Sequence, residues 1–272
     1  MNSIFSPLKI FYMAVWRNLL TLTRYKVNFL FSIITSALWA AGMLLFSLAF
    51  DSIMLGRNVG TTNYVAFIVF GISFQSWQGT ALWGAANMLQ NELGTGQIEY
   101  TFTCPFSRYR YIVSNVAALA VQDSIFFLPM FCFGLWLANT TLTIHGLLLG
   151  LASTILSVAA LVQWGVIFAA LTLRYRQVTA VFSFFNFTIQ MFSGMFIPLQ
   201  ILPAPLQIIG FSVPVTFGMD LLRHYVMETF TIFNPMHEWV ALLVQLALLS
   251  MTAKFVVSYL EGKAKEKGLH YI

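Results

Sequence analysis

Long apolar runs, separated by short polar or basic stretches, dominate the sequence. A membrane-spanning helix needs about 20 mostly apolar residues. The sequence contains six such runs, at 27–50, 64–89, 112–138, 144–172, 178–197 and 238–260. Backbone polar groups in lipid must be hydrogen-bonded within their own segment, so each run is expected to be a helix. The pattern therefore predicts an all-α membrane protein with six transmembrane helices.

Residues 8–25 have one apolar and one polar side when they are placed on a helical wheel. The apolar side includes Leu8 and Leu19, and the polar side carries Lys9, Arg17 and Arg24. An N-terminal amphipathic helix that lies in the membrane interface has this pattern. No signal-peptide cleavage site follows it, so the first span is expected to be retained.

Residues 198–236 are too many for a turn and too apolar for a solvated loop. Five prolines interrupt them, at Pro198, Pro203, Pro205, Pro214 and Pro235, and the charged residues Asp220 and Arg223 lie among them. Irregular backbone at membrane depth is tolerated where protein buries it or where it lines a cavity. We expect short re-entrant helices that dip into the membrane from outside, between the fifth and sixth spans. An ordinary extracellular cap is the alternative.

Composition and charge place the protein in the membrane and orient it. Only 8% of the residues are charged, whereas a soluble domain carries about 25%, so residues 1–272 are expected to form a single membrane domain. The basic clusters are Lys9, Arg17, Arg24 and Lys26, then Arg108 and Arg110, then Arg174 and Arg176, and finally Lys263, Lys265 and Lys267. Six spans put all of them on one side, which predicts an inner (plasma) membrane protein with both termini cytoplasmic. The net charge of +5 therefore requires no nucleic-acid partner.

The common catalytic signatures are missing from the sequence. There is no G-x-x-x-x-G-K-[ST] phosphate loop, and the G-x-G that begins at Gly94 and Gly96 has Glu99 where a dinucleotide site needs its third glycine. Cys104 and Cys132 lie in different segments, without the spacing of a disulfide framework or a metal site. The sequence therefore predicts no enzyme activity, no catalytic residue, no cofactor and no metal in this chain.

Asp123 lies near the middle of the third predicted span. An ionised side chain there costs at least about 2.5 kcal/mol, so such a carboxylate is a functional candidate as a proton relay, an ion ligand or a cavity-lining group. The alternative is a carboxylate capped by a neighbouring amide such as Gln163 or Gln122.

Further polar residues lie in the second and fifth spans. Gln75 and Gln78 belong to the second span, and Asn186 and Gln190 to the fifth, where Phe185 is part of a run rich in phenylalanine. These side chains are candidates for a translocation pathway with an aromatic wall. Because amides also hydrogen-bond between membrane helices, plain helix packing is the alternative.

The stretch NELGTGQIEYTFTCPFSRYRY interrupts the apolar pattern after the second span. Its distinctive residues are Glu92, Gly94, Gly96, Glu99, Pro105 and Arg108. The two glutamates are seven positions apart and would share a helix face, the glycines permit a tight turn, and the proline can end a short helix. Residues 90–106 are therefore either a short cytoplasmic helix or a solvated loop.

Three regions carry a family resemblance: VWRNLLTLTRYKVNFL, NELGTGQIEYTFTCPFSRYRYIVSN and FSGMFIPLQILPAPLQIIGFSVPVTFGMDLLR. In order and spacing they resemble the membrane subunits (permeases) of ABC-2 type ABC transporters, across nearly the whole chain. Two positions depart from the family pattern. Val213 stands where the family usually has Asn before Pro214, and Asn18 follows Arg17 where the polysaccharide-exporting branch often has Arg-Asp. The second departure favours the drug, lipid or natural-product branch.

The resemblance implies an ATP-driven exporter of a hydrophobic or amphipathic cargo. Two permease subunits, expected to be identical, would pair within membrane lipid and dock onto two ATP-binding cassette ATPase subunits, which bind ATP and Mg²⁺. Residues 90–106 would be the coupling helix, with Glu92 and Glu99 facing basic residues of the ATPase. Cargo would move outward between spans one, two and five.

Other functions stay open from the sequence. Export of a lipid-linked polysaccharide, of the O-antigen, teichoic acid or capsule type, would suit an aromatic-rich pathway. A proton-coupled carrier or channel would be centred on Asp123. A membrane scaffold or sensor would move no cargo at all.

Overall fold

The computed structural model describes residues 7–47, 52–97, 100, 104, 107–139, 143–174 and 179–267. Every regular element within these ranges is a helix, and none is a strand. Five helices are long and apolar enough to cross a membrane, or up to six if a bent helix pair counts as one span. The predicted fold class, an all-α membrane protein with a bent pair between its later spans, is confirmed.

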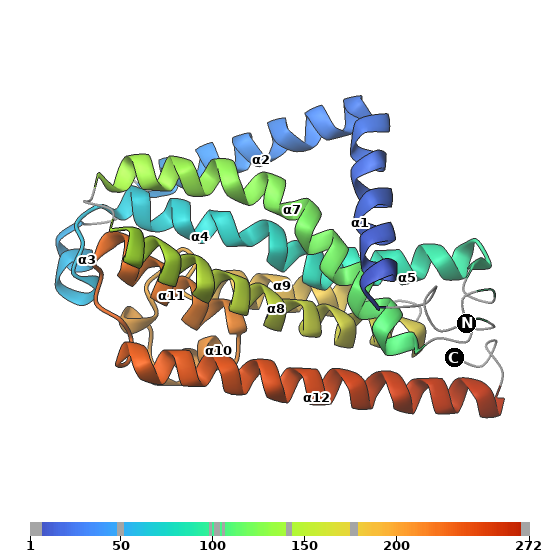
Figure 1. Ribbon diagram of the computed structural model, residues 1–272. Helices are drawn as coiled ribbons and strands as arrows, with labels where there is room; N and C mark the ends of the chain where they lie inside the picture. Colours follow the sequence, from blue (N-terminus) through green and yellow to red (C-terminus); the bar gives the residue numbers. More distant parts are fainter. Residues whose placement is uncertain are drawn as a thin grey trace.

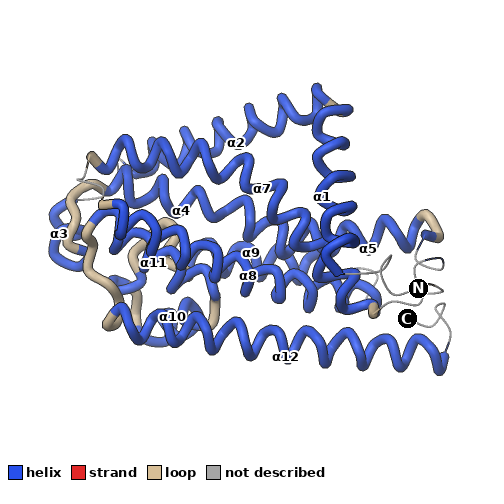
Figure 2. The backbone as a smooth tube through the Cα atoms, in the orientation of Figure 1, coloured by secondary structure: helices blue, strands red, loops and turns tan. Residues whose placement is uncertain are grey.

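The five long helices lie along a common direction, and the loops lie at the two ends of the bundle (Figures 1 and 2). They are α2 (Lys26–Ser47), α4 (Tyr64–Gly79) continued through η1 (Thr80–Gly84) into α5 (Ala85–Gly94), α7 (Arg108–Ala138), α8 (Ile144–Arg174) and α12 (Pro235–Lys267). Each contains most of one predicted apolar run. The run predicted at 178–197 forms a shorter helix, α9 (Thr179–Phe192), because the chain bends at residues 193–197.

Short helices gather at one end of the bundle, called here the α3 end (Figure 1). They are α3 (Ser52–Val59), η2 (Leu199–Ile201), α10 (Ala204–Phe211) and α11 (Pro214–Met227). The last two form the bent pair, with 93° between them, which is the geometry of a broken span or a re-entrant loop.

Prolines mark the starts of these short helices. Pro198 and Pro203 occupy the N-cap positions of η2 and α10, and Pro214 is the first residue of α11, where a missing N–H costs no helical hydrogen bond. Val213, the residue that departs from the family pattern, is a buried, extended N-cap without a capping side chain. Helix α11 therefore begins at Pro214 without a side-chain cap.

Helix α1 (Pro7–Arg24) runs across the long helices at the opposite end of the bundle, called here the α1 end (Figure 1). The last turns of α12 lie at this same end. Helix α1 packs against α7 and buries Ala14 and Asn18 there, whereas Leu8, Tyr12 and Trp16 are exposed. An apolar face that points away from the protein is what an interfacial helix needs.

The core consists mainly of α8 packed against α11 and α12, and of α4 packed against α7. A Cβ atom on Gly218 of α11 would lie 2.4 Å from Ser157 Cβ, and one on Gly71 of α4 would lie 2.0 Å from the Met195 carbonyl oxygen. Neither position has room for a side chain. By contrast, α2 packs mainly against α4, and α9 exposes Phe184 and Phe187.

Candidate functional site

Four polar side chains from three helices meet at the α1 end: Arg17 of α1, Glu92 of α5, and Tyr111 and Asn115 of α7. We call them the strut cluster. The Tyr111 hydroxyl donates to Glu92 Oε1 at 2.5 Å, and Arg17 Nη2 donates to Asn115 Oδ1 at 2.9 Å. Asn115 Nδ2 in turn donates to the Tyr111 carbonyl at 2.9 Å, and the positive charge of Arg17 attracts the Glu92 carboxylate. The cluster ties the end of the second span to α1 and α7.

Glu92 is only 7% exposed, which does not agree with a role as a surface contact for a partner. Helix α5 continues the second span to Gly94, so no separate helix begins at residue 90. Gly96 has a left-handed backbone (φ 71°) and turns the chain away, as a glycine there was expected to permit. Glu99 and Pro105, the other candidates in this stretch, lie outside the described residues.

The remaining basic candidates at the α1 end differ in their surroundings. Arg108 begins α7, donates to the Cys104 carbonyl at 3.0 Å, and has its Nε 4.0 Å from Glu261 Oε1 of α12. Lys9 and Arg24 are exposed on α1. Only Arg17 among the three basic candidates of α1 is therefore part of the strut cluster.

The amides of the second and fifth spans come together between α4 and α9. Gln78 is fully buried and its Nε2 donates to both Oδ1 and the carbonyl oxygen of Asn186, at 3.1 and 3.2 Å. Gln190 reaches the same Oδ1 at 3.5 Å. Gln75 lies elsewhere, where it accepts a 2.6 Å hydrogen bond from Trp39 Nε1 of α2. The polar residues of α4 thus contact two helices, α2 and α9, whose outer faces are uncovered.

Phe185 stands beside this pair of amides on α9. Its ring is 38% exposed and packs edge-on against Phe168 of α8, with the ring centroids 5.5 Å apart. It lies between the protein interior and the open face of α9.

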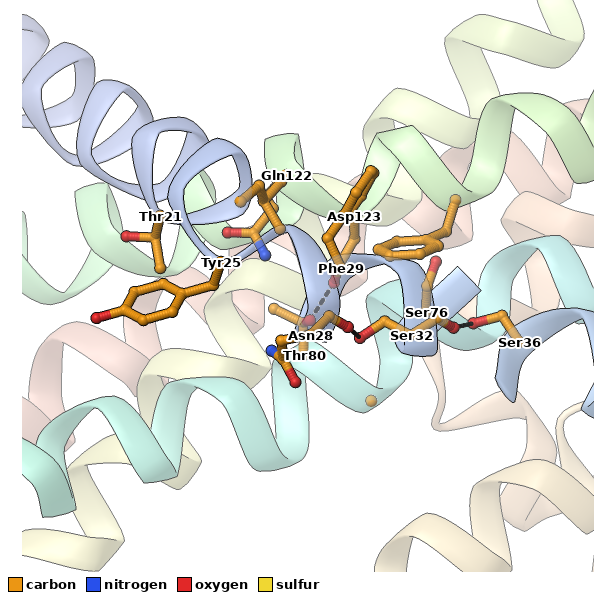
Figure 3. Close-up of a pocket in the computed structure, with 13 residues that line it drawn as sticks. Thr21, Tyr25, Asn28, Phe29, Ser32, Ser36, Ser76, Thr80, Gln122 and Asp123 are labelled. Atoms are coloured by element: carbon orange, nitrogen blue, oxygen red, sulfur yellow. Dashed lines mark hydrogen bonds between the residues drawn. The ribbon is translucent and has the colours of Figure 1, made fainter. Parts of the chain in front are cut away.

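Asp123 lines a cavity of about 430 Å³ between α1, α2, α4, η1 and α7 (Figure 3). Its Oδ2 accepts a hydrogen bond from the hydroxyl of Thr80, the first residue of η1. Gln163, considered above as the capping amide, instead accepts from the Tyr109 hydroxyl at 2.9 Å. Thr80 could not be predicted as the partner of Asp123, because the two residues are 43 positions apart and no local pattern relates them.

Arg223 is almost fully buried at the α3 end. Its Nη1 donates to the Gly194 carbonyl at 2.8 Å, and its Nη2 donates to the carbonyls of Phe67 and Met195 at 2.7 and 2.9 Å. Its guanidinium carbon also lies 3.5 Å from the centroid of the Phe67 ring. These contacts clamp the irregular segment 193–197 onto α4.

Asp220, one helical turn before Arg223, holds the chain that follows α11. Its Oδ2 accepts from the backbone N–H of Ile232 at 2.9 Å, and Glu238 Oε1 accepts from the N–H of Phe233 at 2.8 Å. From α11, Arg223 therefore holds the segment before the bent pair, and Asp220 holds the segment after it.

Comparison with known proteins places most of the chain in one family. Residues 50–253 match the family model described as "ABC-2 family transporter protein". No curated protein matches the sequence. The matched range begins before α4 and ends within α12, so it includes the amides of α4 and α9, Asp123 and the bent pair.

Proposed function

Because that model matches well over half of the chain, the protein belongs to the ABC-2 transporter family as a multi-pass permease domain, and we propose that it is the permease subunit of an ATP-driven exporter. A permease domain of this family is not itself an ATPase. Energy for transport would come from ATP-binding cassette ATPase subunits, which bind ATP and Mg²⁺ and dock at the α1 end. The basic residues gathered at that end support its placement on the cytoplasmic side.

The strut cluster is the observation that supports coupling between the ATPase and the membrane helices. The segment after Gly96 makes the contact with the ATPase, and its displacement pulls on α5. Because Glu92 is bound to Tyr111, and Arg17 to Asn115, α5, α7 and α1 move together. Transport follows only if the ATP-bound partner favours one arrangement of these helices over another. Glu92 thus transmits the motion between helices inside the bundle, and residues 97–106 form the surface that contacts the ATPase.

A second copy of the subunit covers the open faces of α2 and α9. The exposed large apolar residues there include Phe31 and Leu38 of α2 and Phe184 and Phe187 of α9. Gln75 of α4 contacts α2, and the amides of α4 and α9 meet next to α9, with Phe185 beside them. Cargo passes outward along this polar seam, and its apolar rim fits a hydrophobic or amphipathic cargo such as a drug, a lipid or a natural product.

Asn18 favours this cargo class over a lipid-linked polysaccharide. The polysaccharide-exporting branch often carries an aspartate at this position, whereas here a neutral amide is buried against α7. A proton-coupled carrier or channel is disfavoured by the surroundings of Asp123, because its hydrogen-bond partner is a threonine and no other acid lines its cavity.

Co-purification from the native host tests the assignment. The wild-type protein should bring down an ATP-binding cassette ATPase, and the Glu99→Arg plus Tyr100→Ala variant should lose it. Tyr100 is 79% exposed, so this loss would not reflect a damaged core. Arg24→Gln, an exposed change on α1, is the control and should retain the ATPase. Absence of any ATPase with the wild-type protein would overturn the proposed function, and retention by the double variant would overturn the docking segment.

A further inference from the structure

The cavity beside Asp123 has the size and position of a ligand site. Its volume of about 430 Å³ falls within the range of about 300–1,000 Å³ that is usual for small-molecule pockets. It begins at the corner between α1 and α2, where Tyr25 lies, and reaches Asp123, which is halfway along α7 (Figure 3). An amphipathic molecule in the adjoining leaflet would meet this corner first.

The lining of the cavity carries one acid and no base. Thr21, Tyr25, Asn28, Ser32, Ser36, Ser76, Thr80, Gln122 and Asp123 supply its polar groups. A carboxylate at membrane depth is costly unless a positive charge neutralises it. The lining has no lysine, arginine or histidine, so no side chain of the cavity neutralises an ionised Asp123, and a bound cation would do so.

Neutral donors and acceptors surround the carboxylate. Ser76 Oγ is buried and has no hydrogen-bond partner among the described residues, and a buried polar atom without a partner is uncommon. Asn28, from the opposite wall, presents a side-chain amide (Figure 3). A ligand with N–H groups would satisfy Ser76 and neutralise Asp123 together.

Aromatic rings form part of the same wall. Phe29 of α2 and Phe126 of α7 lie 6.3 Å apart, centroid to centroid, and both line the cavity with Tyr25. Aromatic faces attract organic cations. A bare metal ion would leave these rings and most of the volume unused, so the lining fits an organic cation better.

The second span changes its helical geometry at this point. Residues Thr80–Gly84 form a π-helical turn, and Thr80 at its start is the residue that binds Asp123. Such turns are rare and are often found at functional sites. The π-helical turn therefore begins at the residue whose hydroxyl donates to the Asp123 carboxylate.

We propose that this cavity binds the protonated amine of an amphipathic molecule, with Asp123 as the counter-ion and Ser76 as a hydrogen-bond acceptor. That the bound amine is the transported cargo rests on the proposed function, and it narrows the cargo class to amphipathic amines. The aromatic rings hold the carbon atoms next to the nitrogen, and the rest of the molecule extends toward the corner of α1 and α2.

Direct binding tests the site without any transport assay. Radiolabelled dodecylamine is bound to the purified protein in dodecyl maltoside, with dodecanol of the same chain length as the neutral competitor. We expect the amine to bind and the alcohol not to displace it. Asp123→Asn should weaken amine binding by at least about tenfold, through loss of a charge-assisted hydrogen bond.

Two further variants serve as controls that separate loss of the site from unfolding and from a general effect of charge. Ser32→Phe, on the sparsely packed α2, fills the cavity without changing its charge and should also abolish binding. Glu228→Gln makes the same acid-to-amide change at an exposed residue of the α3 end and should bind normally. Equal binding of amine and alcohol, or undiminished amine binding in Asp123→Asn, would overturn the site. Selective amine binding by a protein that recruits no ATPase would support the site and overturn its role in cargo export.

Discussion

The Tyr111 hydroxyl and the Glu92 carboxylate are joined by a 2.5 Å hydrogen bond across 19 residues of sequence. The bond connects the last turns of the second span to the first turns of α7. Asn115 follows Tyr111 by four residues, on the same helix face, and accepts a hydrogen bond from Arg17 of α1. These two hydrogen bonds together fix the relative position of three helices at the end where a coupling motion would enter.

Removing the Tyr111 hydroxyl should weaken the bundle without changing its shape. Tyr111→Phe leaves the buried Glu92 without its donor, which costs about 1–3 kcal/mol. A loss of each kcal/mol lowers the thermal midpoint by about 2–4 °C in a chain of this size. Thermal unfolding in detergent measures the shift, and Tyr12→Phe, an exposed tyrosine of α1, should show none.

The strut cluster should also behave as a unit. Arg17→Met combined with Tyr111→Phe is expected to be non-additive by about 0.5–3 kcal/mol, because both side chains act on Glu92 and α7. Replacing Arg17→Met by Arg24→Met in the same cycle supplies the control, since Arg24 is exposed. Strict additivity of Arg17→Met and Tyr111→Phe would show that the cluster does not link α1 to α5.

The orientation of the protein can be checked with single cysteines in a background in which Cys104 and Cys132 are replaced by serine. Arg57→Cys and Phe230→Cys lie at the α3 end and are exposed. A membrane-impermeant maleimide added to intact cells should label them. Arg24→Cys and Tyr100→Cys, toward the α1 end, should react only after the membrane is opened. The reverse pattern would contradict the placement of the basic clusters in the cytoplasm.

Arg223 should be essential for folding, because its guanidinium holds the irregular segment 193–197 on α4. Arg223→Met leaves the carbonyls of Gly194 and Met195 without their donor, at a cost of about 1–3 kcal/mol for each, and removes the contact with the Phe67 carbonyl of α4. The variant should be recovered from membranes in much smaller amounts and should aggregate on gel filtration. Arg57→Met removes an exposed arginine at the same end and should behave like the wild type.

The spans could be predicted from the sequence because hydropathy acts locally and lipid forces each apolar run into a helix. Ends that depend on tertiary partners were harder to predict. The second span was expected to end at residue 89, before a polar stretch, yet it continues to Gly94, where Tyr111 donates to one carboxylate oxygen of the buried Glu92. The fifth ends early, since Arg223 supplies the donors that an irregular segment at 193–197 needs.

The candidate site shows the same division. Asp123 and the amides of α4 and α9 could be identified because polar residues inside apolar runs are conspicuous. Their pairing could not be identified, because Gln78 and Asn186 are 108 positions apart and nothing local relates Asp123 to Thr80. Arg223 could be placed in the predicted re-entrant region, but its contacts with the carbonyls of Phe67, Gly194 and Met195 could not be predicted.

If two copies of the subunit pair, the exposed faces of α2 and α9 should form the interface between them. Leu38→Cys and Phe187→Cys place thiols on their open faces, in the background that lacks Cys104 and Cys132. If these faces meet across a two-fold axis, oxidation in membranes with copper phenanthroline should give dimers at one or both positions. Leu248→Cys on α12 is equally exposed and should stay monomeric, because α12 packs on the side of α8. Dimers from Leu248→Cys alone would move the interface to α12 and remove the proposed pathway between α2, α4 and α9.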